Sequence, residues 1–224
     1  MERILCLLTG YVFGLFQTGY LYGKMHHIDI RQYGSGNSGT TNALRVMGKK
    51  AGLLVFMGDF LKTVFACLLV RLVMKGDPSV DLYVLYAGLG VVLGHNFPFY
   101  LHFKGGKGIA SMAGILVSMD WRVTLVCASL FLGAVILTRY VSLGSILVVT
   151  AFFIQMVFFG LRGDYAVAEG DRMEFFAVAG VLMVMAIWRH RANIRRLLKG
   201  TEIRFYRTIF LTNCRESGSF CVEK

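Results

Sequence analysis

Long apolar runs alternate with short polar, glycine-rich stretches along this chain. The apolar runs cover residues 4–22, 51–74, 82–99, 109–119, 123–138, 146–161 and 175–187. A helix needs about 20 apolar residues to cross a bilayer, and most of these runs come near that length. The shorter run at 109–119 is either a half-span or a helix that extends back through the preceding glycines. The pattern predicts an all-α, polytopic membrane protein with about seven transmembrane helices.

Composition agrees with this prediction. Apolar residues make up 56% of the 224 residues, charged residues only 17%, and the mean hydropathy is +0.60. Such a composition is not that of a soluble domain. The first apolar run lacks a small-residue cleavage site followed by a soluble domain, so we interpret it as the first span. We expect one integral-membrane domain over residues 1–204 and a C-terminal cytoplasmic tail over residues 205–224.

The charged residues predict the orientation. If all seven runs cross, the loops on one side hold 17 basic and four acidic residues, and those on the other side hold six basic and eight acidic. An excess of Lys and Arg marks the cytoplasmic side. The N-terminus is therefore expected outside and the C-terminus in the cytoplasm. The net charge of +11 is mostly topological, so no nucleic-acid partner is predicted.

The stretch GSGNSGTTN (Gly34–Asn42) contains no bulky apolar side chain. Glycines let consecutive backbone N–H groups converge on an anion, and hydroxyl groups add donors. Thr41 or Asn42 is placed to cap a short helix, and the planar guanidinium of Arg45 suits a phosphate one turn later. A flexible linker is the alternative, but Asn37, Asn42 and the confinement between spans argue against it.

A second glycine-rich loop comprises Lys104, Gly105, Gly106, Lys107 and Gly108. It resembles a phosphate-binding loop, but glycine rather than Ser or Thr follows the second lysine, so it is not a Walker A loop and ATP hydrolysis is disfavoured. A flexible, basic flank of a span is the alternative.

Two further polar segments lie on the same predicted side. Ser142 lies between the fifth and sixth runs and can donate to an anion. His190 and Asn193 are three residues apart, so they share one face of a helix. The arginines around them suit the headgroups of anionic membrane lipids.

The remaining polar residues suggest structural roles. Asp59 and Lys62 fall inside the second apolar run, where isolated charges are costly, so we expect an ion pair rather than a proton path. Cys6, Cys67 and Cys127 lie in apolar runs and are interpreted as small hydrophobic residues. No Cys/His cluster has metal-ligand spacing, so neither a metal nor a cofactor is predicted.

Three classes of function fit a set of phosphate-type loops at one membrane face: an enzyme, a transporter of a phosphorylated metabolite, and a lipid-binding or assembly protein. A transporter usually binds near the bilayer midplane between internal repeats, and no repeat is evident. A protein without chemistry has no need of two anion-binding loops. The sequence favours an enzyme that acts on phosphate-bearing substrates at the cytoplasmic face.

Four blocks carry a family resemblance: GSGNSGTTNALRVMGKKAG, GHNFPFYLHFKGGKGIA, RYVSLGSI and HRANIRRLLKGTE. In order and spacing they resemble the bacterial acyl-phosphate:glycerol-3-phosphate acyltransferases, over residues 10–204. The resemblance implies transfer of a fatty acyl group from acyl phosphate to the 1-hydroxyl of glycerol 3-phosphate. The products are lysophosphatidic acid and inorganic phosphate, in the first acylation step of phospholipid synthesis. It also implies a bacterial cell membrane, a partner enzyme that makes acyl phosphate, and a second acyltransferase.

The resemblance assigns roles to individual residues. Ser35 and Arg45 are implied to be essential, and Asn37, Thr41 and Asn42 to shape the pocket. Lys104, Gly105, Gly106 and Gly108 are implied to hold glycerol 3-phosphate, with Lys107 in the same loop. Ser142, His190 and Asn193 are implied to contact the acyl-phosphate end. Glu202 is expected to hold the fold by pairing with a nearby arginine.

The implied chemistry needs no covalent acyl-enzyme, because acyl phosphate is already activated. The enzyme has to place the glycerol hydroxyl about 3 Å from the carbonyl carbon. It also has to stabilise the developing oxyanion and the departing phosphate, and the candidates for this task are Lys104, Arg45, Ser35 and backbone N–H groups. The hydroxyl proton goes to His190 or to a phosphate oxygen of the donor, and we favour the phosphate. No histidine is followed by Asp five positions later, which separates the chain from acyltransferases that carry His-x4-Asp.

Overall fold

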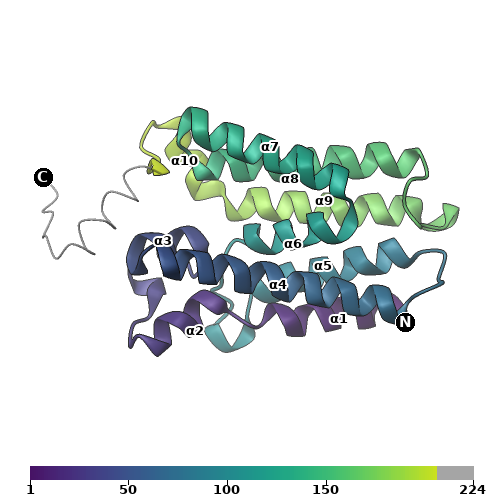
Figure 1. Ribbon diagram of the computed structural model, residues 1–224, viewed down its shortest axis with the longest axis horizontal. Coiled ribbons are helices and arrows are strands. Elements are labelled where there is room, and N and C mark those ends of the chain that lie inside the picture. Colours follow the sequence, from purple (N-terminus) through teal and green to yellow (C-terminus); the bar gives the residue numbers. More distant parts are fainter. Residues whose placement is uncertain (206–224) are drawn as a thin grey trace, which may run out of the picture.

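Helices that run side by side make up the computed structural model, which describes residues 1–205 (Figure 1). The α-helices, in chain order, are α1 (Glu2–Gly14), α2 (Thr18–Met25), α3 (Thr40–Met47), α4 (Lys49–Val73), α5 (Val80–Asn96), α6 (Ile109–Met119), α7 (Trp121–Thr138), α8 (Val141–Leu161), α9 (Arg172–Arg189) and α10 (Arg191–Leu198). Three short 3-10 turns are η1 (Ile30–Gln32), η2 (Phe99–Leu101) and η3 (Glu169–Asp171). The all-α prediction is confirmed for these residues. The predicted tail lies outside them, apart from residue 205.

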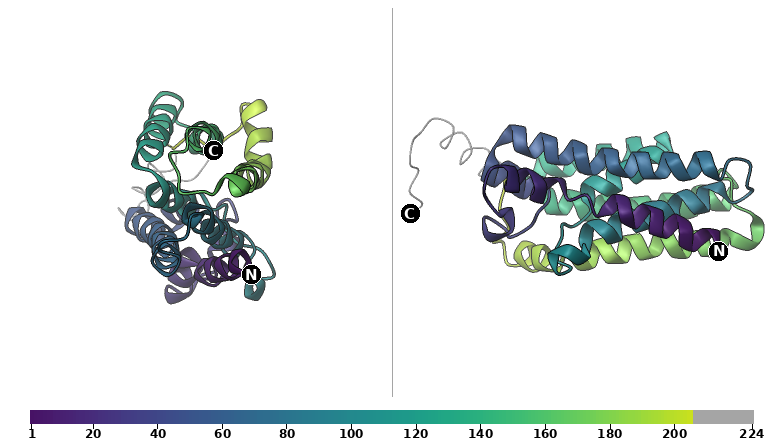
Figure 2. Two further views of the ribbon diagram at one scale, coloured as in Figure 1. Left: turned by 90° about the vertical axis from the view of Figure 1, so that its right-hand side faces the viewer. Right: turned by 90° about the horizontal axis from the view of Figure 1, so that it is seen from below.

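The helices form two layers with α6 between them. α1, α4 and α5 make one layer, and α7, α8 and α9 make the other (Figure 2). The side chains buried where α5, α6, α8 and α9 meet form the main core. Its largest fully buried members are Leu82, Leu85, Met112, Ile115, Phe152, Met156, Phe175 and Leu182. The three cysteines in the apolar runs are all buried, as expected of small hydrophobic residues.

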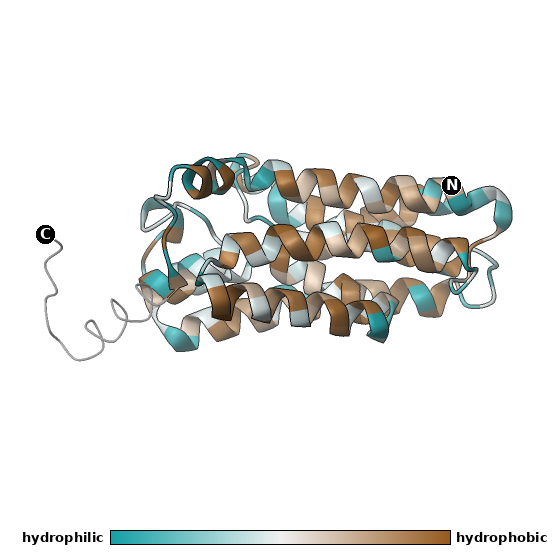
Figure 3. Ribbon diagram, turned by 90° about the horizontal axis from the view of Figure 1, so that it is seen from above, coloured by the Kyte–Doolittle hydropathy of each residue, from teal (hydrophilic) through white to brown (hydrophobic). Residues whose placement is uncertain are grey.

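Five segments in the described part of the chain are long and apolar enough to cross a membrane. They are Glu2–Met25, Lys49–Val73, Val80–Leu101, Trp121–Thr138 and Val141–Leu161. Hydrophobic residues cover the length of the bundle and hydrophilic ones gather at its two ends (Figure 3). The two other predicted spans are also helical, but α6 has only 11 residues and α9 carries charged residues at both ends. The multi-pass prediction therefore holds in this coarser form, while the count of seven and the orientation stay predictions.

The alternative that residues 109–119 continue back as a helix through the glycines is wrong. α6 begins at Ile109, and Gly108 before it has a φ of +81°. A left-handed conformation of this kind cannot continue a right-handed helix, and glycine adopts it without steric cost. The glycine-rich loop is therefore irregular, and the chain changes direction at Gly108, where it enters α6.

α1 and α5 pack with their backbones almost in contact. Gly10 and Gly14 on α1 face Gly90 and Gly94 on α5, and each helix thus presents two glycines four residues apart. A Cβ atom at residue 10 would lie 1.9 Å from the carbonyl oxygen of residue 87, and one at residue 90 would lie 2.1 Å from that of residue 7. This small-xxx-small arrangement is a common way for membrane helices to approach closely. It fixes the position of the C-terminal end of α5, on which the second glycine-rich loop rests.

The first predicted span is interrupted between α1 and α2, at residues 15–17. A break inside a membrane leaves backbone carbonyl groups that need partners. Lys62 Nζ donates to Phe16 O at 2.6 Å, Tyr100 Oη donates to Leu15 O at 2.6 Å, and Gln17 Nε2 donates to Gly14 O at 3.2 Å. The break is therefore closed by side chains from other helices and by its own glutamine.

The predicted ion pair between Asp59 and Lys62 is confirmed. Lys62 Nζ lies 2.8 Å from Asp59 Oδ1, and both side chains are almost fully buried. Asp59 also accepts a hydrogen bond of 3.1 Å from Thr18 Oγ1. The pair thus joins α4 to α2 just beyond the break.

Candidate functional site

The glycine-rich loops and the last helix meet at the end of the bundle opposite the N-terminus. α2, α3 and α10 mark this end in Figure 1, and the α7–α8 junction also lies there. All four sequence blocks therefore contribute to one region, although up to 168 positions separate their outer ends in the chain.

Asn42 organises the first loop. Its Oδ1 accepts the backbone N–H of Ser35 at 2.9 Å, and its Nδ2 donates to backbone carbonyl oxygens of the loop. Those acceptors belong to Ile30, Tyr33 and Asn37, at 3.2, 3.0 and 2.8 Å. A buried amide with four partners of this kind rigidifies the loop. These hydrogen bonds support the expectation that Asn42 shapes the pocket.

The predicted helix cap is wrong. α3 begins at Thr40, its N-cap is Gly39, and no side chain caps it. Asn42 lies inside the helix because its amide is engaged by the loop carbonyls, and Thr41 is half-buried with no side-chain hydrogen bond in the described part of the chain. Asn37 Oδ1 instead accepts the N–H of Gly39 at 2.8 Å. Ser35 is exposed at the tip of this loop.

Glu202 is the centre of a second set of contacts. Ser142 Oγ and Asn193 Nδ2 donate to its Oε1 at 2.9 and 2.6 Å, and Arg196 Nε donates to its Oε2 at 2.7 Å. Burial alone would raise the pKa of Glu202, but these three hydrogen bonds outweigh it and lower the pKa. The expected pairing of Glu202 with a nearby arginine is confirmed, and the carboxylate holds α8 and α10 together.

Lys107 brings the second loop to this cluster. Its Nζ donates to Asn193 Oδ1, while Asn193 Nδ2 bonds to Glu202. Burial, together with the charge of Arg196, lowers the pKa of Lys107 to about 8 against the opposing effect of Glu202. Lys104 is exposed and forms no side-chain hydrogen bond or ion pair within residues 1–205. Of the two predicted lysines, the structure therefore brings Lys107 into the cluster.

Gly105 and Gly106 direct their N–H groups into the protein. They donate to the backbone oxygens of Asn96 and His95 at 3.2 and 3.1 Å. The C-terminal carbonyls of a helix need such partners, so the loop rests on the end of α5. Backbone carbonyl oxygens therefore already accept both of these N–H groups. Gly108 serves as the N-cap of α6.

Arg45 approaches the same cluster from α3. Burial lowers the pKa of its guanidinium, against the opposing charge of Glu202. Its buried Nε has no hydrogen-bond partner among the described residues. A buried cationic donor without a partner is costly, and an anion in contact with it would remove that cost.

His190 connects α9 to α10 and is buried. Its Nδ1 lies 2.8 Å from Ala186 O, so Nδ1 carries the proton and Nε2 keeps a lone pair. Burial lowers the pKa of His190 to about 4, although the hydrogen bond to Ala186 opposes this effect. The side chain is thus neutral at pH 7 and shares the buried face with Asn193, as the spacing predicts.

The cluster has an excess of positive charge. Arg45, Lys107, Arg189 and Arg196 all interact electrostatically with one another or with Glu202, the carboxylate at its centre. Cations gathered around one acid, with hydroxyl and amide donors between them, suit a ligand with several negative charges. The arrangement can therefore bind phosphate groups and stabilise negative charge that develops in a reaction.

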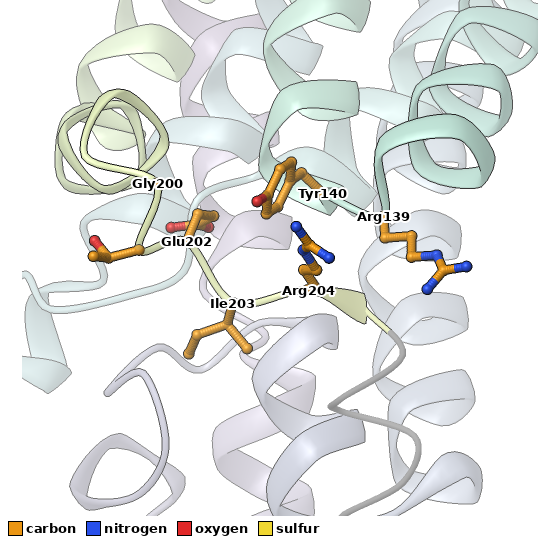
Figure 4. Close-up of a pocket in the computed structure, with 7 residues that line it drawn as sticks. Arg139, Tyr140, Gly200, Glu202, Ile203 and Arg204 are labelled. Carbon is orange, nitrogen blue, oxygen red and sulfur yellow. The ribbon is translucent and has the colours of Figure 1, made fainter.

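A pocket of about 410 Å³ opens beside Glu202. Arg139, Tyr140, Gly200, Thr201, Glu202, Ile203 and Arg204 line it, and Figure 4 shows Arg139 and Tyr140 across from the segment that carries Glu202, Ile203 and Arg204. The predicted Arg139–Ser142 block thus borders the pocket with Arg139 and contacts the Glu202 cluster with Ser142.

Comparison with known proteins identifies the family. Residues 4–200 match the family model described as glycerol-3-phosphate acyltransferase. The glycerol-3-phosphate acyltransferase of Alkaliphilus metalliredigens is 42% identical over 205 residues, which cover 90% of this chain and 95% of the relative. The chain belongs to the glycerol-3-phosphate acyltransferase family.

Other relatives agree with this membership. The acyltransferase of Thermoanaerobacter sp. is 37% identical over 203 residues, covering 90% of this chain and 95% of the relative. A crystal structure of the integral membrane glycerol 3-phosphate acyltransferase PlsY, in a glycerol 3-phosphate form, superposes with a TM-score of 0.78 at 35% identity, covering 92% of this chain and 96% of that one. A lysophosphatidic acid form of PlsY superposes with a TM-score of 0.77 at 33% identity, over 94% and 100% of the two chains. This acyltransferase therefore has an integral-membrane fold.

Three residues of the site were not predicted from the sequence. Arg189 and Arg196 look like membrane-flanking arginines until the contacts with the loop and with Glu202 are seen. Gln17 was not singled out because it lies inside the first apolar run, which was interpreted as one span. Its Nε2 donates to Gly94 O and His95 O at 3.2 and 3.0 Å, and its Oε1 accepts from Ser38 Oγ at 3.4 Å. Gln17 thus joins the first loop to the end of α5.

Proposed function

We propose that this protein transfers a fatty acyl group from acyl phosphate to the 1-hydroxyl of glycerol 3-phosphate. The products are lysophosphatidic acid and inorganic phosphate. The reaction takes place at the cytoplasmic face of the cell membrane, with the N-terminus outside and seven helices crossing.

One observation carries the proposal: in a chain of this family, the buried Nε of Arg45 has no hydrogen-bond partner among the described residues and lies in a cluster with a net positive charge. Both substrates and both products bear phosphate, and each pairs well with guanidinium and ammonium donors. Lys107 is held by Asn193, whose other amide atom is fixed by Glu202. The donors are thus pre-organised, as stabilisation of developing negative charge requires.

The chemical step is a direct displacement. The glycerol hydroxyl oxygen attacks the carbonyl carbon of acyl phosphate, and the bond between that carbon and the bridging phosphate oxygen breaks. Because this attack is direct, no acyl-enzyme forms. The hydroxyl proton passes to the departing phosphate. Phosphate monoesters have a second pKa of about 6, whereas that of His190 is about 4. The phosphate is the stronger base of the two, which supports proton transfer within the substrates.

The side chains then have separate tasks. Arg45 compensates the charge of the departing phosphate and of the oxyanion that forms on the carbonyl, and Lys107, in its glycine-rich loop, holds the phosphate of glycerol 3-phosphate. Asn193 is oriented by Glu202 and keeps a second amide N–H as a neutral donor beside these cations, whereas Ser142 uses its one O–H proton to hold the Glu202 carboxylate. His190 contributes a neutral Nε2 that can accept a hydrogen bond from substrate. Acyl phosphate comes from a partner enzyme, and a second acyltransferase uses the product.

A donor comparison tests the proposal. Purified protein in detergent or lipid is mixed with labelled glycerol 3-phosphate and either acyl phosphate or acyl-CoA, and lysophosphatidic acid and released phosphate are both measured. We expect product from acyl phosphate alone, with one phosphate released per product. Lys107→Met is expected to lose the transfer and Lys199→Met, which alters an exposed lysine at the end of α10, to keep it. Uptake of glycerol 3-phosphate into sealed vesicles without transfer from either donor would support a transporter instead.

A further inference from the structure

The backbone of the Lys104–Gly108 loop is held from two sides. Its amide side rests on α5, through the hydrogen bonds that Gly105 and Gly106 donate to residues 96 and 95. A loop of glycines has many accessible conformations, so the contacts that select one of them decide where Lys107 lies.

Arg189 holds the carbonyl side. Its Nη2 donates to Gly105 O at 2.9 Å and to Gly106 O at 2.5 Å, and its Nε donates to Gly106 O at 3.1 Å. The guanidinium also lies 5.4 Å from the centre of the Phe97 ring. A rigid fork of donors suits two adjacent acceptors in this way. It also compensates the negative ends of two peptide dipoles, which would otherwise repel phosphate oxygens.

His95 supports the same loop from within the bundle. Its Nδ1 lies 3.0 Å from Lys62 Nζ and 3.6 Å from Asp59 Oδ1. An ammonium group only donates, so Nδ1 accepts from Lys62 and the ring proton is on Nε2. A Cβ atom at residue 106 would lie 2.0 Å from that Nε2. The ring, fixed by the buried ion pair, is thus the surface on which Gly106 lies.

We propose that Arg189 and His95 are positioning residues that fix the 104–108 backbone, and thereby place Lys107 beside Asn193 and Glu202. Neither residue bonds to substrate in this account. The Asp59–Lys62 pair contributes to this positioning indirectly, because it sets the orientation of the His95 ring. The kinetic consequence rests on the proposed function, whereas the effect on the loop itself does not.

Hydrogen–deuterium exchange of the loop amides is the direct test. The protein is compared with Arg189→Ala, Arg189→Lys and the matched control Arg191→Ala, whose side chain bonds to Trp188 O instead. We expect at least about tenfold faster exchange at Gly105 and Gly106 in both Arg189 variants and no change in the control. Arg189→Lys keeps the charge and most of the bulk, so it serves if the alanine variant does not fold. Unchanged exchange in a folded Arg189 variant would overturn the proposal.

Kinetics distinguish positioning from direct binding of phosphate by Arg189. We expect the KM for glycerol 3-phosphate to rise at least about tenfold in Arg189→Ala and in Arg189→Lys, since lysine lacks the fork. Methylguanidinium added to the solution should lower the KM of Arg189→Ala most of the way back to the wild-type value. A KM retained in Arg189→Lys would show that the charge alone matters and would overturn the positioning role. If the protein transfers no acyl group at all while the exchange result holds, the proposed reaction fails and the positioning of the loop stands.

His95→Leu examines the second support. It removes the acceptor for Lys62 and the Nε2 surface beneath Gly106, so exchange at Gly106 should accelerate at least about tenfold. Exchange at the wild-type rate in this variant would remove His95 from the proposal.

Discussion

Asn193 donates a hydrogen bond of 2.6 Å to Glu202. The same amide accepts from Lys107 through its oxygen, so the carboxylate determines which way the amide faces and where the lysine is held. A substitution at Glu202 is therefore expected to change the position of Lys107 in the second glycine-rich loop, which belongs to another part of the chain.

The coupling between these two residues is measurable by a double-mutant cycle. Asn193→Ala and Glu202→Ala each remove the shared hydrogen bond, so their effects on the free energy of unfolding should not add. We expect an interaction energy between about 0.5 and 3 kcal/mol, the range for contacting groups in one network. Additive effects would mean that the two side chains do not depend on each other.

His190 should make stability depend on pH. Its pKa in the folded protein is about 4, below its ordinary value of 6.5, so folding favours the neutral ring. This contribution is fully present above about pH 6.5 and is lost as pH falls toward 4, by up to about 3 kcal/mol. The melting temperature of His190→Gln, measured from pH 7 to pH 4, should fall less steeply than that of the wild type. Parallel curves for the two proteins would argue against a buried neutral histidine.

Lys107 should limit activity at high pH. Its pKa is about 8, so the substrate-free enzyme loses this cation as pH rises through that value. The profile of kcat/KM against pH reports groups of the free enzyme and should fall above about pH 8. Arginine does not lose its proton in this range, so Lys107→Arg should move the fall to higher pH. A high-pH limb that is identical in both proteins would assign it to another group.

The contact between α1 and α5 should tolerate no side chain. Gly90→Ala places its methyl group against the backbone of residue 7, and we expect a loss of about 1 to 3 kcal/mol of stability from overpacking. Gly133→Ala is the matched control, because residue 133 lies in α7 and a Cβ atom there meets nothing within 4 Å. Thermal unfolding in one detergent compares the two. Equal melting temperatures would show that the helices are not locked together as described.

The sequence predicted the helices well and the loops only in part. Each apolar run became a helix because burial in a bundle and a membrane depends on local composition. The Asp59–Lys62 pair could also be foreseen, since their spacing puts them on one face. The break at residues 15–17 was missed, because the side chains that satisfy its carbonyls come from distant helices.

The site was predicted as a set of blocks rather than as a geometry. Ser142 and Asn193 were expected there and do meet, at Glu202, which was expected only to hold the fold. The resemblance gave Lys104 the leading role in its loop, whereas the structure brings Lys107 into the cluster, because the left-handed turn at Gly108 and the contacts of Arg189 decide which lysine enters it. The conformation of a loop that is held by tertiary contacts depends on where distant residues lie, and local sequence patterns do not encode those positions.

The measurement that tests the account most directly is single-turnover acyl transfer in Arg45→Ala and in the control Arg191→Ala, with acyl phosphate as donor. Arg45 carries a buried Nε that has no hydrogen-bond partner within residues 1–205, whereas Arg191 is exposed and stacks on Trp188. We expect wild type and Arg191→Ala to form lysophosphatidic acid and phosphate together, and Arg45→Ala to be slower by at least about 100-fold, as when a preorganised donor is removed. Transfer by Arg45→Ala at the wild-type rate would contradict the assignment of this cluster as the site of the reaction.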